Sequence, residues 1–217
     1  GASNIFGGRH VDTLIGGPGN DKLFGQGSSN DRLTGGPGND KLDGGSGDDF
    51  IVETLEGADF LRVTSREMVS GGLGTDVVKN VEKLLITGGA GSNSIDVSGF
   101  DGIATILGGD GDDSIIGTPG ADLLSGDDGN DTINGNAGDD RIFGGNGNDG
   151  LSGYTGNDLL TGGTGDDTLI GHAGADTLNG EEGSDTLVGA GGTTGVDGID
   201  ELTGGPAADL FDGTIDE

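Results

Sequence analysis

Aspartate residues recur at a fixed interval of nine through much of this sequence. Between residues 108 and 188, an aspartate appears every nine residues, in nine successive copies. They are Asp113, Asp122, Asp131, Asp140, Asp149, Asp158, Asp167, Asp176 and Asp185. Carboxylate and backbone carbonyl oxygens are hard ligands that suit Ca²⁺, whereas Zn²⁺ and copper favour imidazole and thiolate. The chemistry that this pattern predicts is therefore cation binding.

These aspartates belong to a nine-residue repeat with fixed residue types at four positions. In all nine copies, positions one and four are glycine, position six is aspartate, and position eight is isoleucine or leucine. The copy "GGTGDDTLI" (162–170) illustrates the pattern. Compositional bias enriches residue types without placing them in phase, so the periodicity argues against a disordered acidic tail.

Further copies divide the chain into four segments. Residues 1–52 hold a second repeat block, in which position six is Asp12, Asp21, Asp31, Asp40 and Asp49. Residues 53–107 match only in part: "GGLGTDVVK" (71–79) contributes Asp76, and "GGAGSNSID" (88–96) has Asn93 at position six. The nine copies fill 108–188, and 189–217 contains an irregular stretch and a last copy, "GGPAADLFD" (204–212).

Each repeat predicts a very short strand followed by a tight turn. The last three residues place one apolar side chain inward, and the glycines of the first six reach positive φ without strain. Two repeats complete a coil of 18 residues, and stacked coils form two parallel sheets with neighbouring strands about 4.8 Å apart. We therefore expect an all-β, parallel β-solenoid.

Such a solenoid has a thin core, because each repeat supplies one apolar side chain and the stacked aspartates repel each other. A cation between the aspartates of successive coils would supply the missing stabilisation. Ca²⁺ accepts six to eight oxygens in irregular geometry, whereas Mg²⁺ requires a strict octahedron. The sequence thus predicts calcium as the bound ion.

The composition limits the partners of the chain. The formal net charge is −30, which opposes binding to nucleic acid and to anionic membranes. There are 53 glycines and no cysteines, so no disulfide can stabilise the fold. No apolar run is long enough to span a membrane, and the first residues show no secretory signal. We expect the isolated chain to be monomeric.

The repeats resemble the glycine-rich calcium-binding nonapeptides of RTX proteins, with the consensus G-G-x-G-x-D-x-U-x. The resemblance implies a parallel β-roll with Ca²⁺ between turns n and n+2, bound by position-six carboxylates and by carbonyls near positions two and four. It also implies a secreted, extracellular bacterial protein that uses type I secretion and folds on meeting calcium outside the cell.

Carried over residue by residue, the resemblance implies seven full sites in 108–188 and three in the N-terminal block, or about ten Ca²⁺ ions. The five aspartates from Asp113 to Asp185 in steps of 18 would line one edge, and the four from Asp122 to Asp176 the other. The implied carbonyl ligands are Gly109, Gly111, Gly120, Gly129, Gly138, Gly145, Gly147, Gly156, Gly163, Gly165, Gly174 and Gly183.

Several positions depart from the consensus. Position two is often not glycine, as at Tyr154 and His172, which weakens turn geometry more than ligation. Ala207 replaces the position-four glycine of the last copy, which disfavours a site at Asp209. The middle segment holds four of the nine basic residues: Arg62, Arg66, Lys79 and Lys83. We therefore interpret 53–107 as metal-poor coils that continue the solenoid, with a globular insert as the alternative.

No arrangement of catalytic residues accompanies the repeats. The G-x-S-x-G and H-E-x-x-H motifs are absent, and paired acids such as Asp166 and Asp167 are better explained by calcium ligation than by glycosidase chemistry. The leading hypothesis is a non-catalytic calcium-binding module, which could be part of a larger exoenzyme. The alternatives are a calcium-dependent adhesin that binds a cell-surface ligand, and a module that binds ice or polysaccharide through outward Thr and Asn such as Thr155/Asn157 and Thr164/Asp166.

Overall fold

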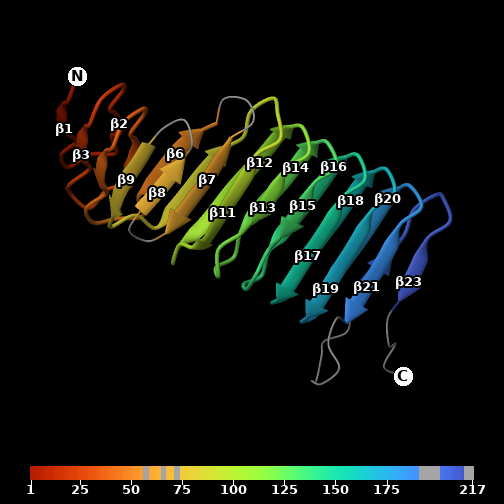
Figure 1. Ribbon diagram of the computed structural model, residues 1–217. Helices are drawn as coiled ribbons and strands as arrows, with labels where there is room; N and C mark the ends of the chain where they lie inside the picture. Colours follow the sequence, from red (N-terminus) through yellow and green to blue (C-terminus); the bar gives the residue numbers. More distant parts are fainter. Residues whose placement is uncertain (56–58, 65–66, 71–73, 191–200, 213–217) are drawn as a thin grey trace.

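The computed structural model describes residues 1–55, 59–64, 67–70, 74–190 and 201–212, and these form strands and turns throughout. The strands stack along one axis as a β-solenoid, with the strands of residues 4–6 and 210–212 at opposite ends (Figure 1). The all-β, coiled architecture expected from the repeat is therefore confirmed. Most of the irregular stretch, the last five residues and Arg66 lie outside the described residues.

The described strands form two sheets of thirteen and ten strands, here called sheet A and sheet B. In spatial order, sheet A contains β1 (Asn4–Phe6), β3 (Lys22–Phe24), β5 (Lys41–Asp43), β9 (Gly74–Lys79), β8 (Glu67–Ser70), β7 (Phe60–Thr64), β11 (Ser94–Gly99), β13 (Ser114–Ile116), β15 (Thr132–Asn134), β17 (Gly150–Thr155), β19 (Thr168–Ala173), β21 (Thr186–Ala190) and β23 (Leu210–Asp212). Sheet B contains β2 (Thr13–Ile15), β4 (Arg32–Thr34), β6 (Phe50–Thr54), β10 (Lys83–Thr87), β12 (Ile103–Asp110), β14 (Leu123–Asp128), β16 (Arg141–Asn146), β18 (Leu159–Thr164), β20 (Thr177–Glu182) and β22 (Glu201–Thr203).

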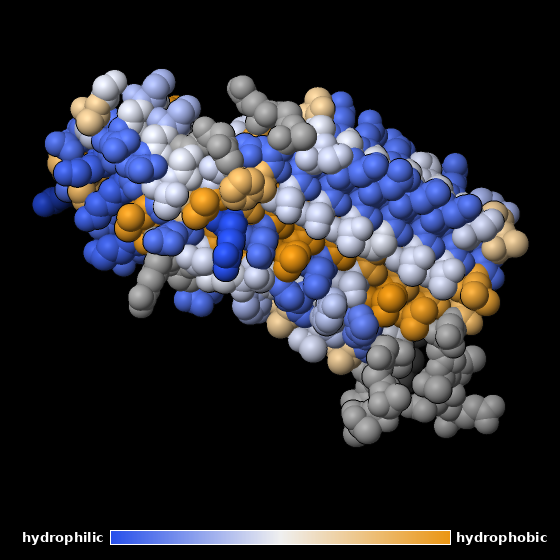
Figure 2. All heavy atoms as spheres, in the orientation of Figure 1, coloured by the Kyte–Doolittle hydropathy of each residue, from blue (hydrophilic) through white to orange (hydrophobic). Residues whose placement is uncertain are grey.

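The register confirms a coil of two repeats in the C-terminal block. Thr132 pairs with Gly150, and Gly150 pairs with Thr168, each 18 residues further on in a parallel ladder. The nine position-eight side chains of 108–188 point between the sheets and are at most 1 % exposed. On the face shown in Figure 2, hydrophilic residues predominate and apolar residues form small, separate groups. The core of the C-terminal block is therefore a single column of Leu and Ile per sheet.

Most strands in the C-terminal block are longer than the three residues expected, whereas β13 and β15 keep that length. From β16 to β20 each strand has six residues, because parallel pairing continues through the first three positions of the next repeat. Gly145, for example, pairs with Gly163. The N-terminal block keeps strands of three residues from β1 to β5.

The middle segment continues the solenoid, but not by simple coiling. Strands β7, β8 and β9 form an antiparallel meander within sheet A, where Arg62 pairs with Val69 and Val69 with Thr75. The meander inserts between β5 and β11, while sheet B passes directly from β6 to β10 and β12. No in-phase glycines force a coil turn between residues 59 and 70, so the chain reverses there instead.

Glycine at position four is required by the close approach of successive coils. Gly165 has φ +122°, and a Cβ atom on it would overlap the carbonyl oxygen of Gly147 one coil below. Side chains rarely adopt this φ, so both the conformation and the available space demand glycine.

Position two tolerates other residues because the backbone there adjusts. Where it is glycine, as at Gly145 and Gly163, φ is 120° and 119°. At three positions that carry a side chain, φ moves toward the left-handed helical region: 74° at Tyr154, 73° at His172 and 71° at Glu181. The side chains of Tyr154 and His172 then stack, with ring centroids 4.6 Å apart.

Two glycines of the C-terminal block provide a matched test of this steric requirement. We expect Gly165→Ala to lower the free energy of unfolding by about 1–3 kcal/mol, because it adds backbone strain and a clash with Gly147. Gly150→Thr should change it by less than about 1 kcal/mol, because the residue sits in an extended strand between Thr132 and Thr168. Denaturant unfolding in saturating calcium measures both, and equal effects would contradict the role assigned to position four.

Candidate metal centre

Position-six aspartates stack in a hydrogen-bonded column along the edge where turns lead into sheet A. The backbone N–H of Asp131 donates to Oδ1 of Asp149 at 2.8 Å, and that of Asp149 donates to Oδ1 of Asp167 at 2.8 Å. The same contact joins Asp113 to Asp131 and Asp167 to Asp185. The structure therefore brings these five predicted residues together on one edge.

The other edge, where turns lead into sheet B, carries an equivalent column. There the N–H of Asp122 donates to Asp140, that of Asp140 to Asp158, and that of Asp158 to Asp176, at 2.8 to 2.9 Å. The N-terminal block repeats the arrangement, with Asp12, Asp31 and Asp49 on this edge and Asp21, Asp40 and Asp76 on the first. Asp76, the position-six residue of the copy at 71–79, thus stacks on Asp40.

Most of these carboxylates use only one oxygen in hydrogen bonding. The second oxygen, Oδ2, is buried and has no hydrogen-bond partner among the described residues at Asp12, Asp21, Asp31, Asp40, Asp49, Asp113, Asp131, Asp140, Asp149, Asp158, Asp167 and Asp185. Burying a carboxylate oxygen without a donor is costly, and ionised groups in such places are normally paired or bound to a metal. These oxygens are therefore the strongest sign of a cation site.

Carbonyl oxygens lie close to the unpaired carboxylate oxygens. A Cβ atom placed on Gly162 would overlap Oδ2 of Asp167 and lie 2.8 Å from the carbonyl oxygen of Gly180 in the next coil. In the same turns, the carbonyl oxygens of Gly129, Gly147 and Gly165 receive no hydrogen bond from the described residues. Among those residues no three acidic or histidine side chains converge on one point. The donor set is therefore mixed, with carboxylates and carbonyls, which fits Ca²⁺.

Burial raises the pKa of the inner aspartates. The pKa is about 8 for Asp140, about 7 for Asp167 and about 6 for Asp131. Desolvation is the largest cause; the backbone hydrogen bond opposes it, and neighbouring carboxylates add to it. A cation between the carboxylates would reverse this effect by favouring the charged form.

Asp122 differs from the other predicted ligands because both its oxygens accept hydrogen bonds. The Thr118 backbone N–H donates to Oδ2 at 2.6 Å, and the Thr118 hydroxyl donates to Oδ1 at 2.9 Å. Oδ1 also accepts the N–H of Ala104 at 2.6 Å. The N–H of Gly120, predicted to contribute its carbonyl, donates to the Thr118 hydroxyl at 3.0 Å. Thr118, at position two, thus satisfies both carboxylate oxygens of Asp122 by hydrogen bonds, where a cation would satisfy them in other repeats.

The last repeat resembles this hydrogen-bonded arrangement. The N–H of Gly205 donates to Oδ2 of Asp209 at 2.9 Å, and Asp209 Oδ1 accepts the N–H of Asp185 at 3.1 Å. Asp209 therefore extends the column although Ala207 replaces the position-four glycine.

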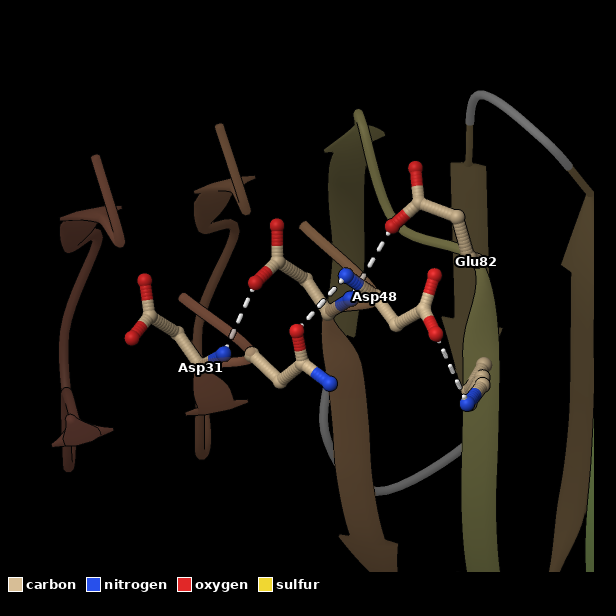
Figure 3. A network of polar contacts seen from close by, with 6 residues as sticks. Asp31, Asp48 and Glu82 are labelled. Atoms are coloured by element: carbon tan, nitrogen blue, oxygen red, sulfur yellow. Dashed lines mark hydrogen bonds and ion pairs between the residues drawn. The ribbon is translucent and has the colours of Figure 1, made fainter. Parts of the chain in front are cut away.

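Two further residues continue the columns into the middle segment. Asn93 accepts the N–H of Asp59 through Oδ1 at 3.3 Å and donates its own N–H to Asp113 at 2.6 Å. On the sheet B edge, Glu82 Oε2 accepts the N–H of Asp49 at 3.0 Å and so takes the place of an aspartate (Figure 3). Sequence reasoning missed Glu82, because it lies outside any recognisable copy of the repeat.

Position five forms a second column that sequence reasoning treated as outward surface. Here the N–H of Asn148 donates to Oδ1 of Asn130 in the preceding coil at 2.9 Å, and the N–H of Asp166 donates to Asn148 at 2.8 Å. These bonds run in the opposite direction to those of position six. The available signal was the frequent Asn or Asp before the position-six aspartate. Each coil is therefore tied to both of its neighbours by side chains.

The raised pKa values predict how the protein behaves in the absence of divalent ions. A carboxylate with a pKa of about 4 when unfolded and 6 to 8 when folded binds its proton more tightly in the folded state. That stabilisation is fully present below about pH 4 and is lost as the pH rises through 6 to 8. We therefore expect the melting temperature in EDTA to fall as the pH rises from 5, until the chain no longer folds near neutral pH.

A variant pair separates this effect from the overall charge. Asp140→Asn should flatten the pH dependence, whereas Glu182→Gln, which removes an exposed carboxylate, should leave it unchanged. Calcium must displace the same protons, so calorimetry in buffers of different ionisation enthalpy should detect proton release on binding at pH 7. A melting temperature in EDTA that is constant from pH 5 to 8 would contradict the raised pKa values.

Comparison with known protein families agrees with the geometry of this site. The family described as "RTX calcium-binding nonapeptide repeat (4 copies)" matches residues 1–23, 6–29, 26–52, 98–133, 116–151, 125–160 and 152–187, which together span more than half of the chain. A search of curated proteins found no matching relative. The matched segments contain most of the position-six aspartates that stack along the two edges. The chain belongs to the RTX calcium-binding nonapeptide repeat family.

Proposed function

We propose that this chain is a calcium-dependent structural module of a secreted bacterial protein, and that it folds when it meets calcium outside the cell. The observation that carries the proposal is the series of buried, unpaired Oδ2 atoms in stacked coils. Each requires a proton or a cation, and at neutral pH millimolar calcium is the available cation that suits oxygen ligands.

The stacked pairs of aspartates support a number of sites close to ten. The C-terminal block provides seven pairs, of which the Asp122/Asp140 pair is weakened by Thr118. The N-terminal block provides three, and the contact between Asp40 and Asp76 adds another. About ten Ca²⁺ ions would offset about twenty of the thirty negative charges, which turns repulsion between coils into cross-linking.

Weak sites would suit a fold that responds to the difference in calcium between cytoplasm and exterior. We expect a dissociation constant of about 10⁻⁴ to 10⁻³ M per site, as in other extracellular modules. Neighbouring sites share an aspartate, so filling should be cooperative. In the cytoplasm such a chain would stay unfolded, which would assist its passage through a type I secretion channel.

The proposed role of this chain is structural rather than catalytic. The acidic pairs that would suggest hydrolysis are engaged in the position-five and position-six columns, as at Asp166 and Asp167. Among the residues that the structure describes, none forms a helix with the length and apolarity that crossing a bilayer requires. An enzymatic activity, if the parent protein has one, would belong to another domain.

Calcium titration tests the proposal directly. We expect the far-ultraviolet circular dichroism in EDTA at pH 7.5 to be that of an unfolded chain, and β structure to appear cooperatively in the millimolar CaCl₂ range. Elemental analysis after dialysis against dilute calcium should give about ten ions per chain. Equal β content in EDTA and in calcium would refute the proposal.

Matched variants connect the titration to individual sites. Asp158→Asn should lower the calcium content, because Asp158 belongs to two successive pairs and its Oδ2 is unpaired. Asp122→Asn should lower it less, because Thr118 already occupies the oxygens of Asp122. The same loss in both variants would mean that unpaired oxygens do not mark the sites.

A second candidate function, adhesion to ice or to a repetitive polysaccharide, rests on one row of hydroxyl groups. Position seven along sheet A reads Ser94, Ser114, Thr132, Gly150, Thr168 and Thr186 in paired register. Such a row presents hydroxyls about 4.8 Å apart. The predicted pairs at positions three and five do not form rows, since Thr155 is paired with Ala173 and Thr164 with Glu182.

Thermal hysteresis of the calcium-loaded protein tests this second candidate. The interruption at Gly150 and the single row predict little or no hysteresis, and a glycan array read with and without calcium covers the polysaccharide alternative. Strong hysteresis that is lost in Thr168→Val but kept in Asn134→Asp would favour the adhesive role.

A further inference from the structure

One charged residue occupies a place that other repeats reserve for glycine. Glu53 directly follows the repeat that covers residues 44–52, so it stands at position one of the next unit. In sheet B, β4 pairs with β6, and the residue at position one after β4 is Gly35. Every position-one residue in the nine copies of 108–188 is glycine, so Glu53 is a departure that the repeat does not explain.

The side chain of Glu53 is buried without compensation. The residue is 4 % exposed, and Oε2 has no hydrogen-bond partner among the described residues. From the described part of the chain, Oε1 accepts a single contact, from the N–H of Thr54 at 3.3 Å. Its partner across the strand pair is Ile86, which is fully buried. A carboxylate in such surroundings needs a counter-charge or a proton.

Two further carboxylates lie close to the position-one residue of the preceding coil, Gly35. A Cβ atom on Gly35 would lie 2.5 Å from Oδ2 of Asp40 and 2.9 Å from Oδ2 of Asp76, so these two oxygens approach one spot. Asp40 and Asp76 are 3 % and 2 % exposed, and Oδ2 of Asp40 is unpaired. Both ion pairs found among the described residues, Lys79 with Asp43 and Lys83 with Asp48, leave the three acids without a basic partner.

We propose that Glu53, Asp40 and Asp76 together bind one divalent cation in a three-carboxylate site at the junction of the N-terminal repeats and the middle segment. This inference rests on the proposed calcium function and adds a ligand that the repeat does not encode. The three carboxylates do not converge on one point among the described residues, so the proposed site requires Glu53 to turn about its side-chain torsions toward the ion.

The third carboxylate makes this site tighter than the two-carboxylate sites of the C-terminal block. Ligand charge is one of the factors that set calcium affinity, and a more negative site binds at lower ion concentration. The junction therefore orders first as calcium rises, and trivalent Tb³⁺ gains more from it than Ca²⁺ does.

Hydrogen exchange read peptide by peptide tests the site in the full chain. During a titration with Ca²⁺ alone, the peptides that contain residues 35–53 should reach half protection at about tenfold lower calcium than peptides from 126–185. Glu53→Gln should raise the midpoint of the first set by about tenfold and leave the second unchanged. Glu67→Gln, which removes an exposed carboxylate in β8, is the matched control and should shift neither.

The outcomes separate this inference from the proposed function. If no peptide of the wild-type chain gains protection with calcium, the proposed function fails. If protection appears but Glu53→Gln and wild type share one midpoint, the three-carboxylate site is wrong and Glu53 is held by a proton instead. Should Glu53→Gln not fold in saturating calcium, Glu53→Gly restores an ordinary repeat turn, and its midpoint should match that of 126–185; an unchanged early midpoint would overturn the site. A parallel titration with Tb³⁺ alone should show a larger early shift.

Discussion

The stability of this fold is limited chiefly by buried carboxylate oxygens that lack a hydrogen-bond donor. Coils of the two repeat blocks present aspartates whose Oδ1 accepts a backbone hydrogen bond from the neighbouring coil and whose Oδ2 has no partner among the described residues, as at Asp131 and Asp149. The core of one Leu or Ile per repeat is too thin to offset many buried charges of one sign. The fold therefore depends on an agent that neutralises these oxygens, and the composition of the ligands makes calcium the best candidate.

The same requirement explains the departures from the repeat. Where Thr118 stands at position two, its hydroxyl and N–H occupy Asp122, and where Asn93 replaces aspartate, the column continues with a neutral amide. In the middle segment, apolar residues such as Val63, Ile86 and Val97 are fully buried and thicken the core. These coils have less need of an ion, and that agrees with the metal-poor character proposed for 53–107.

The sequence could predict the features that follow from the nine-residue period of the repeat. The nine-residue period placed Asp113 to Asp185 and Asp122 to Asp176 on separate edges, because an 18-residue coil returns every second repeat to the same edge. Features that depend on side-chain torsions or on a reversal of the chain could not be predicted from the sequence. The contacts of Thr118 with Asp122, the substitution of Glu82 for an aspartate, and the antiparallel strands β7 to β9 have no periodic signature. The column at position five was visible in the sequence as frequent Asn and Asp. The direction of its hydrogen bonds could be seen only in the structure.

The meander of β7 to β9 has a consequence for how the two repeat blocks are connected. In solenoids, cooperativity passes from each repeat to the next through their shared interface. On the sheet A edge, the column from Asp21 to Asp76 is separated by β8 and β7 from the column that starts at Asp59. On the sheet B edge, the N–H of Glu82 turns to the carbonyl of Asp49, so the column ends there and resumes at Asp122. The side-chain columns of the two repeat blocks are thus separate, and only the paired strands and the apolar core of the middle segment connect one block to the other.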